Sequence, residues 1–123
     1  MPSPRQQSGS HGEELALKYL EDQGYRRLEQ QWRSRYGEID LIMMDQDELV
    51  FVEVKLRSSH DFGLPEEMVS RSKTNRISKT AECYLEKNNP EERFWRFDTI
   101  AITLRGSHYE IFHLKDTIRH DDL

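Results

Sequence analysis

Residues 37–55 read GEIDLIMMDQDELVFVEVK and predict two antiparallel strands joined by a short polar turn. In the second strand, valines alternate with Phe51, Glu53 and Lys55. Side chains two apart on a strand share a face, so Glu53 and Lys55 are expected to point the same way. A hairpin would also bring Asp40 of the first strand next to Glu53. The stretch therefore predicts a sheet that carries a small group of charged side chains.

A divalent-cation site is one interpretation of Asp40, Glu53 and Lys55. Two neighbouring carboxylates repel one another unless they share a proton or a cation, and Mg²⁺ or Mn²⁺ prefers oxygen ligands. A lysine beside them could orient or help deprotonate a water and stabilise charge on a phosphate. The alternative is a solvated ladder of charges on an edge strand. The pattern alone does not decide between the two.

The segments on either side complete one mixed α/β domain. The predicted order is a helix (12–23), three strands (25–32, 36–44, 48–57), a helix (65–88) and two strands (94–104, 108–114). We expect residues 1–10 to be a disordered lead-in, residues 11–114 to form the folded domain and residues 115–123 to be a polar tail.

The first predicted helix adds a third acid to the candidate site. At 100° per residue, Glu13 falls at the margin of the apolar side, whereas Glu14 lies opposite, where it can pair with Lys18. Stabilisation of the first turn by the helix dipole would explain Glu13 on its own. Beside Asp40 and Glu53, however, Glu13 is expected to contact the metal directly or through water.

The charge pattern gives a mixed signal about nucleic acid. The formal net charge of −5 argues mildly against such a partner, but basic residues cluster in two segments. Lys73 falls within the apolar stripe of the second predicted helix, where it could meet a phosphate or extend to solvent. The residues expected to contact nucleic acid are Arg35, Arg57, Arg71, Lys73, Arg76 and Lys79.

Other features narrow the class of protein. A single cysteine, Cys83, cannot form an internal disulfide, so a reducing cytoplasm is expected, and no apolar run reaches membrane-spanning length. The five histidines lack zinc-binding spacing. Asp98, set among apolar strand residues, is expected either to form a buried salt bridge or to support the site from behind.

The motifs GEELA at residues 12–16, GEIDLI at 37–42 and FVEVK at 51–55 resemble those of the bacterial YraN family. That family is similar to the PD-(D/E)XK nucleases, particularly the archaeal Holliday-junction resolvases. The resemblance implies a restriction-endonuclease-like αβββαββ core, with a mixed five-stranded sheet flanked by helices. It also implies a Mg²⁺ (or Mn²⁺) site formed by Glu13, Asp40 and Glu53, with Lys55 as the catalytic lysine.

Together these features favour a metal-dependent endonuclease acting on DNA, including branched or repair and recombination intermediates. The alternative is a non-catalytic nucleic-acid-binding or adaptor protein on a nuclease scaffold. The sequence leaves open whether the nucleic acid is DNA or RNA. It also leaves open a homodimer, which resolvase-like enzymes use because a junction has paired strands.

Overall fold

The computed structural model describes residues 4–58, 71–88 and 94–118, with side chains described at 11–57, 76–88 and 94–117. Within these residues, two helices and five strands follow one another in the predicted order. They are α1 (Pro4–Asp22), β1 (Arg26–Ser34), β2 (Gly37–Asp45), β3 (Glu48–Ser58), α2 (Arg71–Asn88), β4 (Trp95–Arg105) and β5 (His108–Ile118).

The five strands form one mixed sheet in the order β1-β2-β3-β4-β5. The pairs β1–β2, β2–β3 and β4–β5 are antiparallel, whereas β3 and β4 are parallel. A parallel pair needs a crossover connection, and the segment that contains α2 provides it. The predicted α/β fold with a mixed five-stranded sheet is confirmed.

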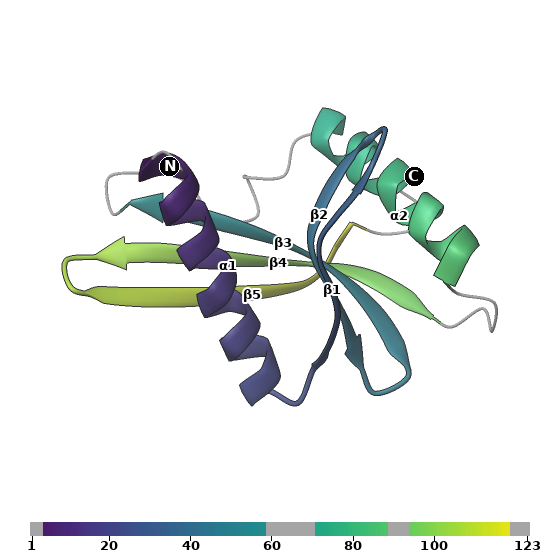
Figure 1. Cartoon of the computed structure of the whole chain (residues 1–123). Coiled ribbons are helices and arrows are strands. Elements are labelled where there is room, and N and C mark those ends of the chain that lie inside the picture. The colour runs from purple at the N-terminus through teal and green to yellow at the C-terminus, as the bar shows by residue number, and fades with distance from the viewer. Residues whose placement is uncertain (1–3, 59–70, 89–93, 119–123) are drawn as a thin grey trace.

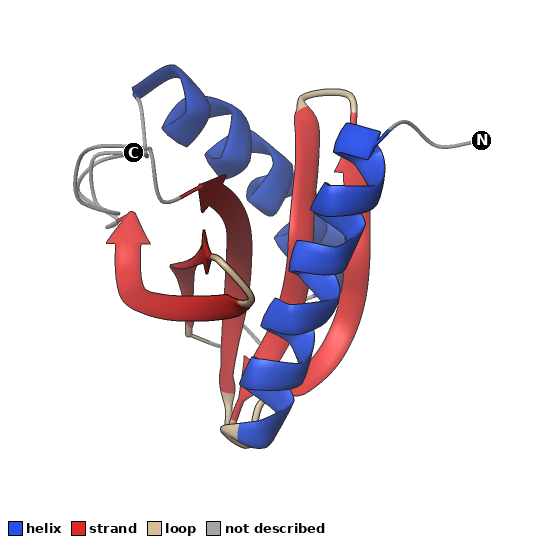
Figure 2. Ribbon diagram, turned by 90° about the vertical axis from the view of Figure 1, so that its left-hand side faces the viewer, coloured by secondary structure: helices blue, strands red, loops and turns tan. Residues whose placement is uncertain are grey.

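The two helices cover opposite faces of the sheet (Figures 1 and 2). Side-chain alternation along β3 explains this arrangement, because successive residues point to opposite faces. Val50 and Val52 pack with Leu20 in the core under α1, whereas Phe51 packs with Tyr84 in the core under α2. The sheet is therefore buried on both sides along its middle.

Both ends of the described chain extend further into regular structure than the sequence predicts. Helix α1 begins at Pro4 instead of residue 12, so residues 4–10 are helical and not a disordered lead-in. Proline suits a first helical turn, and the next turns are supported by the sheet, since His11 packs edge-on against Tyr109 and Gly12 lies against Leu56.

Strand β5 likewise continues to Ile118, so residues 115–118 belong to the sheet and not to a tail. The extension runs through a register shift against β4 between Phe97 and Thr99, with Asp116 at a φ of 57°. Backbone pairing with β4 supports these polar residues, which the side-chain pattern could not reveal. The expected loop after β3 and the expected start of the second helix fall within residues 59–70, outside the described residues.

The feature that matters most for function is a fork between β2 and β3. Their pairing runs from the hairpin turn to Leu41 opposite Val52 and stops there. Beyond it, the turn between β1 and β2 lies beside α2, while β3 continues alongside β4 and β5 (Figure 1). Asp40 and Glu53 are the first residues past this fork. Neither α1 nor α2, the helices of the described residues, is long and apolar enough to cross a bilayer.

Candidate metal centre

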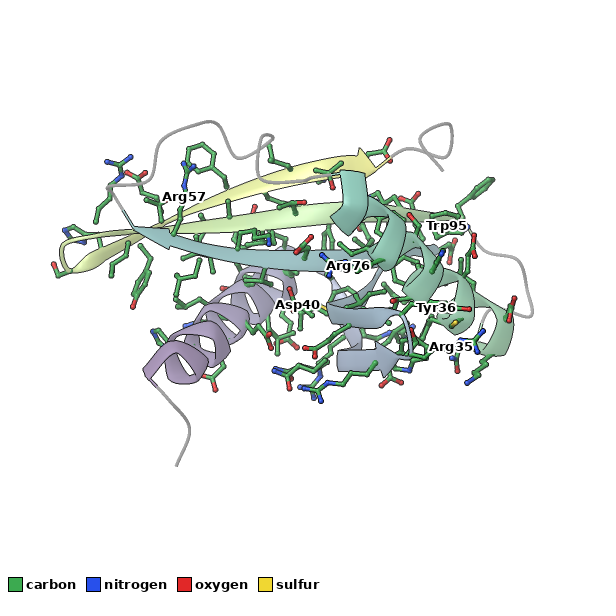
Figure 3. The ribbon with its side chains drawn as sticks, turned by 90° about the horizontal axis from the view of Figure 1, so that it is seen from above. Arg35, Tyr36, Asp40, Arg57, Arg76 and Trp95 are labelled. Atoms are coloured by element: carbon green, nitrogen blue, oxygen red, sulfur yellow. The ribbon has the colours of Figure 1, made fainter. Side chains whose placement is uncertain are left out.

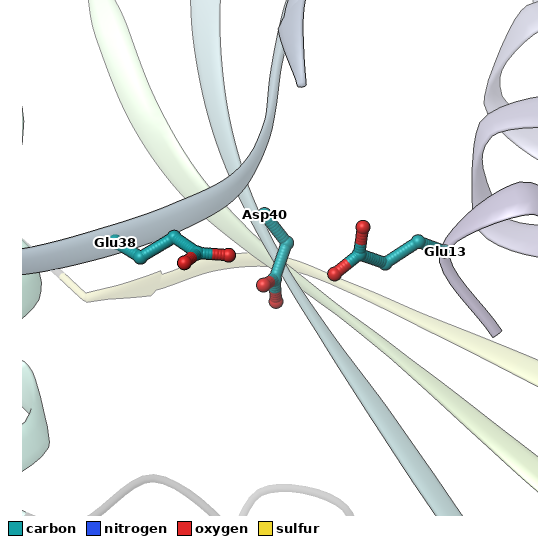
Figure 4. Close-up of side chains that lie close together, drawn as sticks. All are labelled: Glu13, Glu38 and Asp40. Atoms are coloured by element: carbon teal, nitrogen blue, oxygen red, sulfur yellow. The ribbon is translucent and has the colours of Figure 1, made fainter. Parts of the chain in front are cut away.

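Three carboxylates from two elements meet at the fork. Glu13 of α1 and Glu38 and Asp40 of β2 each offer an oxygen that lies within 4.8 Å of the other two. Asp40 lies in the middle, with Glu38 on one side and Glu13 on the other (Figure 4). Three carboxylates at this separation suit a hard divalent cation, which takes oxygen ligands and relieves their mutual repulsion.

Asp40 is held in place by the fork itself. Its Oδ2 accepts a hydrogen bond from the backbone N–H of Val54 at 2.8 Å. The Asp40 side chain thus contacts the β3 backbone just beyond the point where the two strands stop pairing. Burial raises the pKa of Asp40 to about 7; the Val54 hydrogen bond opposes this rise, and the charges of Glu13, Glu53 and Glu38 add to it. A proton or a cation is therefore favoured at Asp40 near neutral pH.

Glu13 is the most buried glutamate among the described residues, with 9% of its surface exposed. Glu14 is exposed, so the orientation predicted from the helical phase is confirmed. Burial raises the pKa of Glu13, and a hydrogen bond from Gln31 Nε2 to Glu13 Oε2 at 3.0 Å opposes the rise. The predicted role of Glu13 as a metal ligand stays a prediction.

Glu53 and Lys55 share a face of β3, as predicted, and Lys55 Nζ lies 3.1 Å from Glu53 Oε1. Burial raises the pKa of Glu53, and the nearby positive charges of Lys55 and Arg76 oppose the rise. Glu53 is not a member of the three-carboxylate group, where sequence reasoning had placed it beside Asp40. It lines the same surface hollow of about 170 Å³ as Asp40, together with Arg76 of α2.

Two residues of this site escaped the sequence analysis. Glu38 stands two residues before Asp40 on one strand, a spacing that shares a face, so its place in the group had a signal. Gln31 had none: it lies 18 residues from Glu13 in sequence and adopts a φ of 52°, which is uncommon outside glycine. It stands in β1 between the paired residues Gln30 and Trp32, across from Asp40.

Comparison with known proteins places the chain among close relatives. Residues 12–102 match the family described as Uncharacterised protein family UPF0102. The chain belongs to this family. It is 45% identical over 109 residues to a UPF0102 protein of Syntrophus aciditrophicus (89% of this chain, 86% of the relative). It is also 48% identical over 110 residues to one of Psychromonas ingrahamii (87% and 89%). The predicted membership of the YraN family, which carries the UPF0102 description, is confirmed.

The basic residues expected to contact nucleic acid divide between two parts of this UPF0102 chain. Arg35 in the β1–β2 turn and Arg76 and Lys79 on α2 lie on the α2 side of the fork. Arg57 is separate, because its Nε donates to Thr103 Oγ1 at 2.9 Å toward the far end of β3 (Figure 3). Arg71 and Lys73, which were also predicted to contact nucleic acid, belong to α2. Their side chains lie outside the described ones.

Asp98 forms a buried ion pair, one of the two roles expected for it. Arg96 Nε lies 2.9 Å from Asp98 Oδ1, and His113 Nε2 lies 2.7 Å from Asp98 Oδ2. Burial alone would raise the pKa of Asp98, but the hydrogen bonds from His113, Arg96 and the Asp116 backbone hold it below its usual value. This acid is neutralised by its own neighbours and stands apart from the three-carboxylate group.

Proposed function

We propose that this UPF0102 protein is a cytoplasmic, Mg²⁺- or Mn²⁺-dependent endonuclease that hydrolyses phosphodiester bonds in DNA, with branched or repair and recombination intermediates as substrates. The observation that carries the proposal is the meeting of Glu13, Glu38 and Asp40 at the fork, with the pKa of Asp40 raised to about 7. Such a group is costly to the folded protein unless something positively charged binds there. Perturbed carboxylates in a surface hollow are typical of functional sites.

Asp40, Glu13 and Glu38 would hold the cation, with Glu53 as a further ligand from the hollow. When bound, a divalent cation polarises the phosphate and lowers the pKa of a coordinated water. The chain's own residues supply the rest. Lys55, 3.1 Å from Glu53, would orient the attacking water and take part in its deprotonation. Arg76 lines the hollow and would draw the phosphate toward the carboxylates.

The expected homodimer and the choice between DNA and RNA stay predictions. A second candidate function is a nucleic-acid-binding or adaptor protein without turnover. It is favoured by one observation: Glu38 is paired with Arg33 at 2.8 Å and Glu53 with Lys55, so part of the negative charge is balanced without a cation. The two functions differ in whether metal is needed for any effect on the substrate.

The test is cleavage of linear, nicked and four-way DNA in Mg²⁺, Mn²⁺ or EDTA. We expect wild type to cut at least one substrate with metal and none with EDTA. Because the cation stabilises transition-state charge by several kcal/mol, Asp40→Asn should cut about 100-fold more slowly or worse. The exposed neighbour of Glu13 gives a matched control: Glu13→Gln should lose activity and Glu14→Gln should keep it.

Two outcomes contradict the nuclease proposal: no substrate is cut under any condition, or Asp40→Asn cuts as fast as wild type. Binding that is the same in EDTA and with Glu53→Gln, in a protein that cuts nothing, supports the adaptor instead.

A further inference from the structure

A second concavity lies next to the candidate metal centre. It has a volume of about 610 Å³ and lies between the β1–β2 turn and α2. Two aromatic residues, Trp32 and Tyr36, line it together with the basic residues Arg33, Arg35, Lys79 and Lys87. None of the three carboxylates of the metal centre lines it. We call it the turn cleft.

The turn cleft and the hollow at the metal centre share a border. Tyr36 lines both, so a chain-like ligand leaving Asp40 and Glu53 reaches the cleft by passing this ring. Figure 3 shows Arg35 and Tyr36 beside α2, with Asp40 and Arg76 further toward the fork. The two concavities can therefore act on one extended ligand.

Tyr36 is linked to α2 through Ser34, and two cations lie over its ring. Its backbone N–H donates to Ser34 Oγ at 3.0 Å, and Ser34 Oγ donates to Thr80 Oγ1 of α2 at 3.3 Å. Arg35 donates to the Tyr36 hydroxyl at 2.6 Å, with its Cζ 4.8 Å from the ring centroid, and Lys79 Nζ lies 5.6 Å from that centroid. Both cations are exposed. An aromatic ring beside exposed cations is the arrangement with which proteins bind single-stranded nucleic acid.

We propose that the turn cleft binds an unpaired stretch of the substrate strand next to the phosphodiester that is cut. One base stacks on the Tyr36 ring, where Arg35 and Lys79 lie in the free protein, and the two cations move from the ring to the phosphates on either side. The inference rests on the proposed function, which it deepens by naming the substrate class: strands with unpaired nucleotides, such as flaps, overhangs and opened junctions.

The size and charge of the turn cleft favour a single strand over a duplex. A volume of about 610 Å³ lies in the range that encloses a small ligand, enough for a nucleotide or two. A duplex presents a much larger surface than a nucleotide or two, since its major groove alone is about 12 Å wide. Glu82 and Glu86 also line the cleft and repel phosphates, which confines the strand to the side of Arg35 and Lys79.

Binding is tested without metal, so that it does not depend on cleavage. Fluorescence anisotropy in EDTA would follow a labelled thymidine oligonucleotide of about a dozen nucleotides, in DNA and RNA forms, with the full-length protein. Loss of a stacked base weakens binding by roughly 5- to 150-fold, so Tyr36→Ala should show this loss and Tyr36→Phe should stay within about twofold of wild type. The tighter of the two strands identifies the sugar.

Two lysines offer a matched pair. Lys79 on α2 and Lys18 on α1 are both exposed and lie on helices that cover opposite faces of the sheet. Alanine suits a helix, so neither substitution disturbs the fold. Lys79→Ala should weaken binding and lower the slope of log affinity against log salt by about 0.7, as expected for one lost phosphate contact, whereas Lys18→Ala should change neither. An abasic strand has no base to stack, so its affinity for the wild type should be low. We expect it to be no higher than the affinity of Tyr36→Ala for the thymidine strand.

The inference is overturned if Tyr36→Ala and Lys79→Ala bind both strands like wild type, or if Lys18→Ala weakens binding as much as Lys79→Ala. Cleavage separates this failure from failure of the proposed function. A protein that binds the strand through Tyr36 but cuts nothing keeps the cleft and loses the nuclease. A protein that cuts blunt duplex as fast as duplex with an unpaired extension, regardless of Tyr36→Ala, keeps the nuclease and loses the cleft.

Discussion

Asp40 and Asp98 are aspartates on inner strands of one sheet, Asp40 partly buried and Asp98 buried, yet their surroundings are opposite. Asp98, 1% exposed, is met by Arg96, His113 and a backbone N–H. Asp40 accepts one hydrogen bond from the Val54 backbone and otherwise has the acids Glu13 and Glu38 as close neighbours. As a result, the pKa of Asp98 falls below its usual value, and that of Asp40 rises to about 7.

The difference separates an acid that stabilises the fold from one that burdens it. Asp98 sits where its charge is matched inside the protein, so ionisation favours folding. At Asp40 ionisation opposes folding, and a rise from 3.8 to about 7 corresponds to roughly 4 kcal/mol as an upper bound. Proteins keep such an unfavourable group where function needs it. The comparison can be broken or sharpened by the following experiments.

Asp98→Asn should produce the largest loss of stability. The substitution leaves His113 beside a neutral amide, while Arg96 keeps Asp45 and Glu48 as partners. We therefore expect a loss of about 3 kcal/mol, the low end of the cost of breaking a buried pair. Urea denaturation would measure it as a lower midpoint with an unchanged slope. A loss below about 1 kcal/mol would mean that Asp98 does not anchor the fold.

Asp40→Asn should act in the other direction and depend on pH. The folded-state pKa of Asp40 is raised, so its favourable contribution is complete below about pH 4 and is lost as the pH rises through about 7. At pH 8 the variant should therefore be more stable than wild type, by up to about 4 kcal/mol, and the difference should shrink toward pH 5. Denaturation midpoints at both pH values test this.

An equal midpoint for the two proteins at pH 8 would contradict the idea that Asp40 carries unrelieved repulsion. Asp98 gives the matching control, since its lowered pKa predicts stability that is present above about pH 4 and lost on further acidification.

Addition of Mn²⁺ should relieve the same repulsion. A cation that binds only the folded protein stabilises it by about 2.7 kcal/mol at a hundred times its dissociation constant. Wild type should therefore melt at a higher temperature with Mn²⁺ at pH 8, and EDTA should remove the gain. Asp40→Asn is the control, because this variant lacks one of the three carboxylates. Its melting temperature should rise little with Mn²⁺. An equal gain in both proteins would place the cation elsewhere.

Gln31→Leu should have the smallest effect, and on activity more than on stability. Its amide holds Glu13 at 3.0 Å, and loss of a residue that orients a metal ligand typically costs 10- to 100-fold in metal affinity or activity. We expect about tenfold in the Mn²⁺ dependence of cleavage. Gln31→Asn keeps an amide and tolerates positive φ, so it should retain more activity than Gln31→Leu. If the two variants behave alike, Gln31 serves the backbone and does not position Glu13.

The sequence predicts what depends on local periodicity. The alternation in β3 placed Glu53 and Lys55 on one face, and the helical phase chose Glu13 over Glu14; the structure agrees with both. The separation of Glu53 from the group at Asp40 could not be predicted in this way, because it depends on where β2 leaves β3. A perfect hairpin would have set Asp40 opposite Glu53, whereas the fork directs Asp40 toward Glu38 and Glu13. Where two strands separate is decided by long-range packing, and no local pattern records it.

Strand β1 lies at the edge of the sheet and holds two of the three carboxylates of the metal centre in position. Gln31 donates a hydrogen bond to Glu13, and Arg33 forms an ion pair with Glu38. Both residues belong to this outermost strand. Separation of β1 from β2 would remove these partners from two of the three carboxylates at once. Amide hydrogen exchange across residues 26–34 would then report how often β1 separates from β2 in the absence of substrate. A molecule that binds along the outer edge of β1 would oppose this separation and keep the metal centre assembled.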